Sequence, residues 1–151
     1  MSVQVQTADF DTGAELAALR AADPAAGALV SFVGLVRDLN AGQAVADLIL
    51  EHYPGMTERS LATLEQTACA RWPLGAVRIV HRIGPLRPQD QIVLVAVTSA
   101  HRGDAFAACE FIMDTLKTTA PFWKREVRSD GVHWVDARDS DATAAARWQL
   151  P

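Results

Sequence analysis

Ile92-Val-Leu-Val-Ala-Val97, followed directly by Thr98-Ser-Ala-His-Arg-Gly103, is the stretch of sequence that decides the fold. Its apolar part shows no polar alternation, which is typical of a strand covered on both faces. Apolar residues then recur at helical spacing from about Asp104 to Thr118, so we expect a helix there. A strand, a short polar loop and a helix therefore follow one another, and His101 and Arg102 fall where the helix begins.

The sequence on either side of this stretch alternates between strand and helix patterns. Residues 1–26 carry little pattern apart from one short helix, Gly84–Pro88 is expected to be a loop, and Ser129–Gly131 predicts a hairpin turn. The mixture predicts an α/β or α+β fold with at least one layered sheet. The expected strands are Ala28–Arg37, Val45–Tyr53, Val77–Ile83, Phe122–Val127 and Val132–Val135, and the expected helices are Thr12–Ala22, Thr57–Trp72 and Ser140–Trp148.

The length and composition are those of one domain, taken here as residues 1–151. The chain has 151 residues, 50% of them hydrophobic, and a formal net charge of -4. A mildly acidic chain is a poor candidate for sequence-independent nucleic-acid binding. We see no apolar run of the ~20 residues that a membrane span needs and no secretory signal pattern, so we expect a cytoplasmic protein.

The cysteines and three of the four histidines lack the spacing of metal ligands. Cys69 and Cys109 stand among alanines in helical stretches, so we interpret both as small buried hydrophobes rather than redox or catalytic groups. His52, His81 and His133 lie in expected strands, and we interpret them as structural.

Lys117 and Lys124 are the only lysines of the chain. Lys117 falls on the last turn of an expected helix, and Lys124 follows the Pro121 break, so a chain reversal there would bring both ammonium groups together. Each cation would lower the pKa of the other, and a lysine tuned in this way can serve as general acid, general base or nucleophile. The alternative is that both are solvated, with Lys117 stabilising the C-terminal end of the helix dipole.

His101 and Arg102 lie between a buried strand and a helix N-terminus, a common place for an anion or phosphate. Arg37 follows a strand that contains Gly34, and a glycine inside a strand indicates a bulge or the close approach of a ligand. The alternative for these residues is a polar surface loop. Together with the two lysines they predict an anion pocket and a phosphorylated small substrate, without saying which one.

Several stretches resemble the large, catalytic subunit family of molybdopterin synthase. The resemblance runs from about Gly27 to Trp148, and the combination of its motifs is highly specific. The matching stretches are Ser31-Phe-Val-Gly-Leu-Val-Arg-Asp38, Leu50-Glu-His-Tyr-Pro-Gly-Met56, Arg71-Trp-Pro-Leu-Gly75, His81-Arg-Ile-Gly84, Val97-Thr-Ser-Ala-His-Arg102 and Lys117-Thr-Thr-Ala-Pro-Phe-Trp-Lys-Arg-Glu126.

The resemblance implies an α+β fold of the α/β hammerhead type, with a mixed, largely antiparallel sheet packed with helices and a small hairpin subdomain. It also implies a homodimer that binds two copies of a small ubiquitin-like sulfur-carrier subunit, giving a heterotetramer. The carrier ends in a Gly-Gly thiocarboxylate, and the substrate is cyclic pyranopterin monophosphate. Transfer of two sulfurs gives the dithiolene of molybdopterin, in molybdenum cofactor biosynthesis. No metal or other cofactor is implied, because molybdenum is inserted later by other proteins, and neither nucleic acid nor a membrane is an implied partner.

The resemblance also implies roles for individual residues. Lys117 and Lys124 match the family's two essential lysines, with Lys117 near the carrier's terminal carbonyl in acid/base transfer and Lys124 holding substrate. The other implied substrate contacts are Leu35, Val36, Arg37, His101, Arg102, Arg125 and Glu126. Met113 and Arg138 match pocket-lining positions that reach toward the other copy's site.

Two other functions stay open at this point. One is a binding module that docks a ubiquitin-like tail without turnover, although such a module need not keep Lys117, Lys124, His101 and Arg102 together. The other is an unrelated hydrolase of a phosphorylated ligand, against which the lack of a metal motif and of a positioned nucleophile argues.

Overall fold

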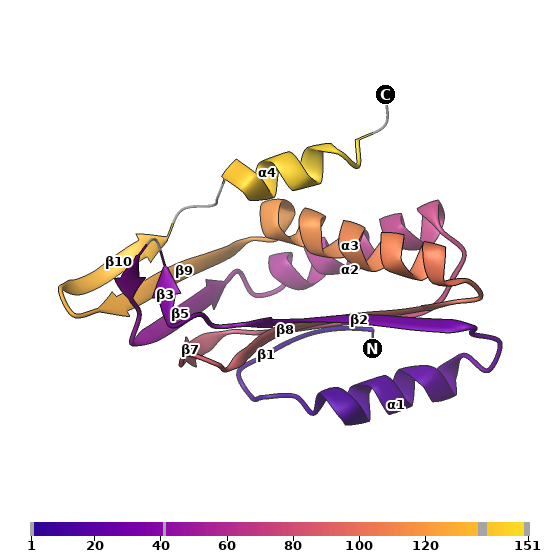
Figure 1. Ribbon diagram of the computed structural model, residues 1–151, viewed down its shortest axis with the longest axis horizontal. Helices are drawn as coiled ribbons and strands as arrows, with labels where there is room; N and C mark the ends of the chain where they lie inside the picture. Colours follow the sequence, from indigo (N-terminus) through magenta and orange to yellow (C-terminus); the bar gives the residue numbers. More distant parts are fainter. Residues whose placement is uncertain (1, 41, 136–138, 150–151) are drawn as a thin grey trace.

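The computed structural model describes residues 2–40, 42–135 and 139–149 (Figure 1). The helices are α1 (Thr12–Ala22), α2 (Met56–Arg71), α3 (Arg102–Thr119) and α4 (Asp139–Ala146). The strands are β1 (Val3–Gln6), β2 (Ala28–Leu35), β3 (Leu39–Asn40), β4 (Gln43–Ala44), β5 (Asp47–His52), β6 (Leu74–Arg82), β7 (Gly84–Leu86), β8 (Gln91–Ser99), β9 (Phe122–Arg128) and β10 (Gly131–Val135).

The main sheet has the strand order β1-β6-β8-β2 and lies between two layers of helix. Helices α2 and α3 cover one face and α1 covers the other, as Figure 1 shows. Because β8 lies inside this sandwich, every residue from Val93 to Ser99 is buried, as the unbroken apolar run predicts. The pairings β2–β8 and β6–β8 are antiparallel and β1–β6 is parallel. The expected α+β class with a mixed, largely antiparallel sheet is confirmed.

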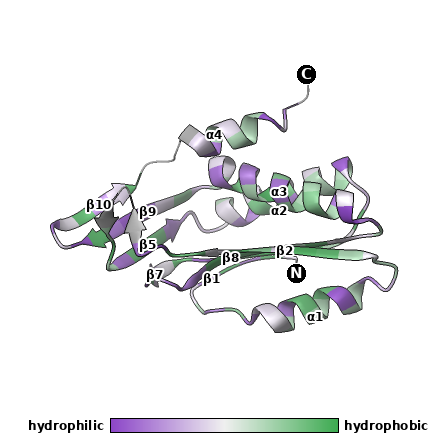
Figure 2. Ribbon diagram, viewed as in Figure 1, coloured by the Kyte–Doolittle hydropathy of each residue, from purple (hydrophilic) through white to green (hydrophobic). Residues whose placement is uncertain are grey.

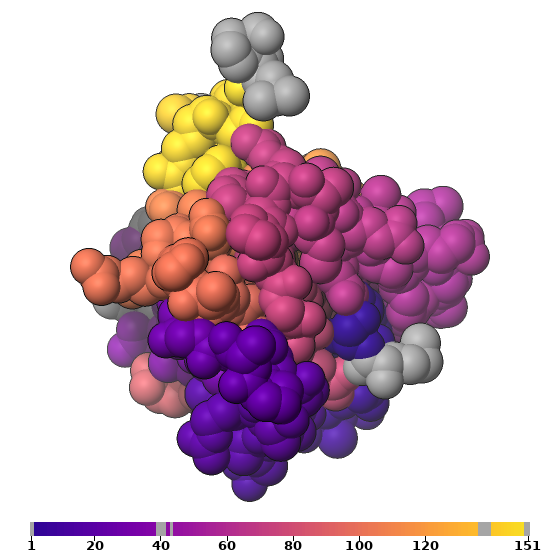
Figure 3. Space-filling model, turned by 90° about the vertical axis from the view of Figure 1, so that its right-hand side faces the viewer, coloured from indigo at the N-terminus to yellow at the C-terminus, as the bar shows by residue number. Residues whose placement is uncertain are grey.

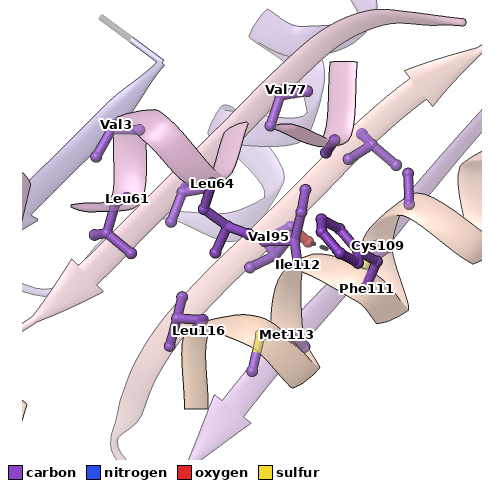
Figure 4. Close-up of a cluster of buried hydrophobic side chains, with 14 of the residues drawn as sticks. Val3, Leu61, Leu64, Val77, Val95, Cys109, Phe111, Ile112, Met113 and Leu116 are labelled. Atoms are coloured by element: carbon purple, nitrogen blue, oxygen red, sulfur yellow. Dashed lines mark hydrogen bonds between the residues drawn. The ribbon is translucent and has the colours of Figure 1, made fainter. Parts of the chain in front are cut away.

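The largest hydrophobic cluster lies between this sheet and helices α2 and α3 (Figure 4). Within it the Cys109 thiol lies 3.8 Å from the carbonyl oxygen of Val95, drawn as a dashed line in Figure 4. Burial raises the pKa of the Cys109 thiol to about 11, so this cysteine is an inert core residue, as expected. Cys69 is exposed instead, and its predicted burial is wrong, because it lies on the outward side of α2.

A second sheet, with the order β10-β9-β5-β7, lies at one end of the main sheet, on the left in Figure 1. The predicted β9–β10 hairpin is confirmed, with Gly131 pairing with Arg128 beside the turn. A smaller hydrophobic cluster fills the inner face of this sheet and consists of Val36, Leu48, Leu50 and Leu86. In Figure 2 the hydrophobic colour runs along β2 of the main sheet, whereas hydrophilic residues interrupt β9.

Three local expectations differ from the structure. Residues Val3–Gln6 form β1, a strand that the sequence reading missed, although Val and Gln alternate there as in a half-buried strand. Gly84–Leu86 is a short strand rather than a loop, because Leu86 pairs with Leu48 of β5. The helix expected from Thr57 starts at Met56, since the positive φ of 83° at Gly55 lets the chain turn there.

Candidate active site

Helix α3 carries predicted site residues at both of its ends, and the ends are far apart. Arg102 is its first residue, His101 is its N-cap, and Lys117 lies in its last turn. With a rise of 1.5 Å per residue, about 22 Å of helix separates Arg102 from Lys117. His101 and Arg102 are exposed at the end of the molecule that Figure 3 views directly, with the orange of α3 at its surface. One chain therefore does not bring all five predicted basic residues into one pocket.

The turn between α3 and β9 brings the two lysines to one buried imidazole. Lys117 is exposed, whereas Lys124 is half-buried on β9 opposite Leu50. Burial, together with the charges of Lys124 and Lys117, lowers the pKa of His81 to about 3, although a backbone hydrogen bond to the carbonyl oxygen of Arg82 opposes the shift. The two lysines flank Phe122 in the chain, and the Phe122 ring stacks on His81. The chain reversal expected from the sequence is present, and it places the lysines on the same side of the molecule.

Two side-chain contacts hold this turn in place. The hydroxyl of Thr57 donates to the carbonyl oxygen of Pro121 at 3.0 Å and accepts from the N–H of Tyr53 at 3.1 Å. The His81 ring stacks on Phe122 with 3.7 Å between ring centroids and 17° between planes. Thr57 is completely buried, so its two hydrogen bonds replace those that water would have made.

Arg37 lies at the same end of the molecule as the two lysines. It follows Val36, which is buried in the small cluster with Leu50, the residue that pairs with Lys124. The expected irregularity at Gly34 is confirmed, because the β2–β8 register shifts between Gly34 and Leu35. Leu35 is exposed and Val36 is buried, so of these two only Leu35 offers its side chain to a ligand.

Arg125 and Glu126 leave β9 on opposite faces, because side chains alternate along a strand. Glu126 is on the face of Lys124, is only 3% exposed and lies 3.3 Å from the guanidinium of Arg128. Arg125 is on the other face, where it pairs with Glu51 at 2.5 Å and its guanidinium lies over the ring of Trp134 at 5.4 Å. The structure thus puts Glu126 beside Lys124 and turns Arg125 away from it.

Comparison with known proteins identifies the family. A family model described as MoaE protein matches residues 5–119. The chain belongs to the MoaE family. It is 60% identical over 149 residues to a protein from Ralstonia nicotianae named molybdopterin synthase catalytic subunit, covering 99% of this chain and 85% of that protein. A protein of the same name from Vibrio cholerae is 58% identical, with 97% of each chain covered. The solved structure of the molybdopterin biosynthesis MoaE protein from Burkholderia ambifaria MC40-6 superposes with a TM-score of 0.85 at 57% identity and covers 99% of both chains.

The resemblance also predicts two further positions in this MoaE-family chain, of which the structure describes one. Met113 is buried in the main core cluster between α3 and the sheet. Arg138 lies outside the described residues. Sequence reasoning placed His81 among structural histidines and did not connect it with the lysines. The signal was available in His81-Arg-Ile-Gly84, one of the stretches shared with the family, but no spacing links it to residues about forty positions later.

The surface of the MoaE-family chain also has a groove that does not include the lysines in its lining. It lies between α2 and α3, has a volume of about 410 Å³, and contains none of the predicted site residues. Over the described residues, no group of three or more His, Cys, Asp or Glu side chains could hold a metal ion, and no helix is long and apolar enough to cross a membrane. The cations at the α3–β9 turn therefore remain the candidate site.

Proposed function

We propose that this protein is the catalytic subunit of a molybdopterin synthase. It transfers sulfur from the thiocarboxylated end of a small ubiquitin-like carrier to cyclic pyranopterin monophosphate. The observation that carries the proposal is the position of Lys117 and Lys124 on either side of the α3–β9 turn, where Phe122 between them stacks on His81, in a chain that belongs to the MoaE family. Cytoplasmic location is part of the same proposal, as is the heterotetramer of two catalytic and two carrier chains.

The reaction brings two anions together, the carrier's thiocarboxylate and the substrate's phosphate. Cationic side chains at the site reduce the repulsion between them. A thiocarboxylate is already a good nucleophile, so the protein need not supply a cysteine or serine for the attack. The ammonium of Lys117 interacts with the carrier's terminal carbonyl and moves protons during sulfur attack, while Lys124 and Arg37 neutralise the phosphate. Glu126 lies on the face of Lys124 but is 3% exposed and pairs with Arg128, so its expected hydrogen bonds to the pterin edge stay a prediction.

A second copy of the chain supplies the remaining cations. Strand β2 is at the edge of the main sheet, and Phe32 and Leu35 on it are 43% and 49% exposed. An exposed apolar edge strand is a ready surface for pairing with an identical strand across a two-fold axis. In such an antiparallel pair the Ala28 end of one copy lies beside the Leu35 end of the other.

This pairing brings the His101 and Arg102 of one copy toward the lysines of the other, although α3 separates them within one chain. Ala28 pairs with Ser99, so the Ala28 end of β2 is close to the loop that carries His101 and Arg102. Phe106, 61% exposed on the first turns of α3, adds apolar surface at the same end. In the dimer the partner subunit's His101 and the partner subunit's Arg102 then approach Arg37 and the lysines. The five basic groups converge only in this assembly.

A reconstituted sulfur-transfer assay tests the proposed function. It mixes the chain with a thiocarboxylated carrier and cyclic pyranopterin monophosphate and measures dithiolene product. Lys117→Ala and Lys124→Ala are each expected to lower turnover by about 10²-fold or more, because each removes a general acid–base or charge-stabilising group. Arg20→Ala is the matched control, since Arg20 is also an exposed cation in the last turn of a helix but lies across the sheet on α1.

The outcome separates the enzyme from a binding module. Circular dichroism must show that both lysine variants stay folded, as expected for exposed or half-exposed side chains. Wild-type rates in either variant would remove that lysine from the mechanism. Binding of the carrier without any product in the parent protein would contradict the enzymatic function and favour a docking module.

A further inference from the structure

His81 is a buried imidazole at the α3–β9 turn. It is 5% exposed and lies on β6, between Val93 of β8 and Val5 of β1 in the sheet register. Its ring stacks on Phe122, which stands between Lys117 and Lys124 in the chain. A buried polar ring at this place therefore contacts the segment that joins the two functional lysines.

The tautomer of this imidazole follows from its hydrogen bond. The Nδ1 atom lies 2.8 Å from the carbonyl oxygen of Arg82, and a carbonyl oxygen only accepts, so Nδ1 carries the proton. Burial, and then the nearby cations, lower the pKa of His81 to about 3, so the ring is neutral at physiological pH. The second nitrogen, Nε2, is consequently an acceptor with its lone pair available.

The groups that face His81 come from three elements and are mostly cationic. Lys124 belongs to β9, Lys117 to α3 and His52 to β5, and all three disfavour a positive charge on the ring. Glu58 lies 3.4 Å from His52 and offsets that residue rather than the lysines. On β9, Phe122 and Lys124 are two residues apart and so lie on the same face of the strand. The Lys124 side chain and the His81 ring that stacks on Phe122 thus lie on the same side of β9.

We propose that His81 is a positioning residue for the sulfur-transfer site. Its stack on Phe122 fixes the turn that carries the lysines, and its Nε2 lone pair accepts a hydrogen bond from the Lys124 ammonium. The Nε2 acceptor favours the protonated form of Lys124 and fixes the direction of its ammonium group. The neutral His81 ring adds no positive charge of its own. This role rests on the function proposed above, because positioning matters only if the lysines act on a substrate.

The presence of only two lysines makes a direct test possible. Reductive methylation with ¹³C-formaldehyde labels Lys117, Lys124 and the chain's α-amino group, and Lys→Arg variants assign the two lysine signals by NMR. In His81→Phe the stack is kept and the acceptor is lost. The pKa of Lys124 should then fall by about one pH unit, the size expected for losing a hydrogen bond to a charged group. His81→Gln, whose amide oxygen can accept, should recover at least half of that shift.

His133→Phe is the matched control, because His133 pairs with Asp130 on the exposed hairpin instead. It should leave both lysine titrations unchanged. Unchanged titrations in His81→Phe would overturn the proposal whether or not the protein is an active enzyme. If His81→Phe fails to fold, ¹⁵N NMR of the unmethylated protein decides. Nδ1 should be protonated, and Lys124→Ala should shift the Nε2 resonance, whereas a protonated Nε2 or an unmoved resonance would contradict the role.

Kinetics supply the readout that links positioning to catalysis. If the ammonium of Lys124 is the working form, the alkaline limb of the rate–pH profile reports its loss. That limb should move to lower pH in His81→Phe by the same amount as the NMR titration and return toward the parent in His81→Gln. A uniform loss of rate without any shift of the limb would indicate a structural role alone and overturn the proposal. An inactive parent protein with a shifted Lys124 titration would contradict the proposed function and not the hydrogen bond.

Discussion

Strand β8 of the main sheet and strand β9 of the second sheet differ in the polarity of their side chains. In the main sheet, β8 buries an unbroken run from Val93 to Ser99 between helical layers. In the second sheet, β9 carries Lys124, Arg125 and Glu126 in succession. Two buried side-chain nitrogens without a hydrogen-bond partner are found among the described residues, and both are in β9, the Nε atoms of Arg125 and Arg128. The unpartnered nitrogens are a polar cost, and they lie on the strand that carries the proposed site residues Lys124 and Glu126.

The same comparison bears on the proposal that two copies of the chain share the site. The main sheet separates its two ends by the length of α3, with His101 at one end and Lys117 at the other. The second sheet lies at the lysine end alone. A rigid frame of this kind cannot bend its ends together, so in the function proposed above the remaining cations come from a second copy.

The largest expected effect concerns this sharing between copies. Lys117→Ala and Arg102→Ala chains should each be nearly inactive as homodimers. Dimers reassembled from equal amounts of both should recover about a quarter of parental activity, because half of the dimers are mixed and each has one intact site. The sulfur-transfer assay measures this recovery. A mixture that stays as inactive as its parents would show that each site belongs to one chain.

The next prediction distinguishes a residue that stabilises the fold from the residues of the proposed site. Leu94 is completely buried in the main sheet against α1, so Leu94→Ala should lower the free energy of unfolding by about 2–5 kcal/mol. Turnover per folded molecule should stay near the parental value, since the hydrophobic cluster that holds Leu94 includes none of the predicted site residues that the structure describes. Urea denaturation and the assay at low temperature measure the two quantities. Loss of turnover in a fully folded variant would contradict the view that the main sheet affects stability and not turnover.

A pH effect is expected at the junction of the two sheets. The pKa of His81 is about 3 in the folded chain, below its ordinary value of 6.5. The unfolded chain therefore binds the extra proton below pH 6.5, and folding stability is lost as pH falls from there toward 3. Between pH 7 and pH 4.5 this histidine should account for about 2–3 kcal/mol of that loss. His81→Phe should show a correspondingly flatter dependence in urea titrations at both pH values, and His133→Phe should not.

The smallest expected effect is on the outer hairpin. Val132 is exposed on β10, so Val132→Ala should change the free energy of unfolding by no more than about 0.5 kcal/mol. The same urea titration measures it. A change in the free energy of unfolding comparable to that of Leu94→Ala would mean that the hairpin contributes to stability as much as the main sheet does.

Much of the fold could be predicted because its signals are local. The apolar run of β8, the helical spacing of α3 and the turn residues of the β9–β10 hairpin each lie within a few residues, and all three elements are where they were expected. The short strands β1 and β7 were missed because they depend on partners far away, β6 and β5. Cys69 was assigned to the wrong side of its helix, since α2 has a weak apolar stripe.

The sequence by itself determined the types of side chain at the site and the turn that joins its lysines. Reversal after Pro121 is a local property of the chain, and so is the helix start at His101. The expected helix also placed Arg102 and Lys117 at its two ends, so their separation by a helix length is local information. Only the tertiary structure decided that His81 of another strand stacks on the turn between the lysines and that Val36, next to Arg37, packs with Leu50 opposite Lys124. Sheet pairing and packing join residues without regard to their separation in the chain, so no spacing in the sequence records those distances.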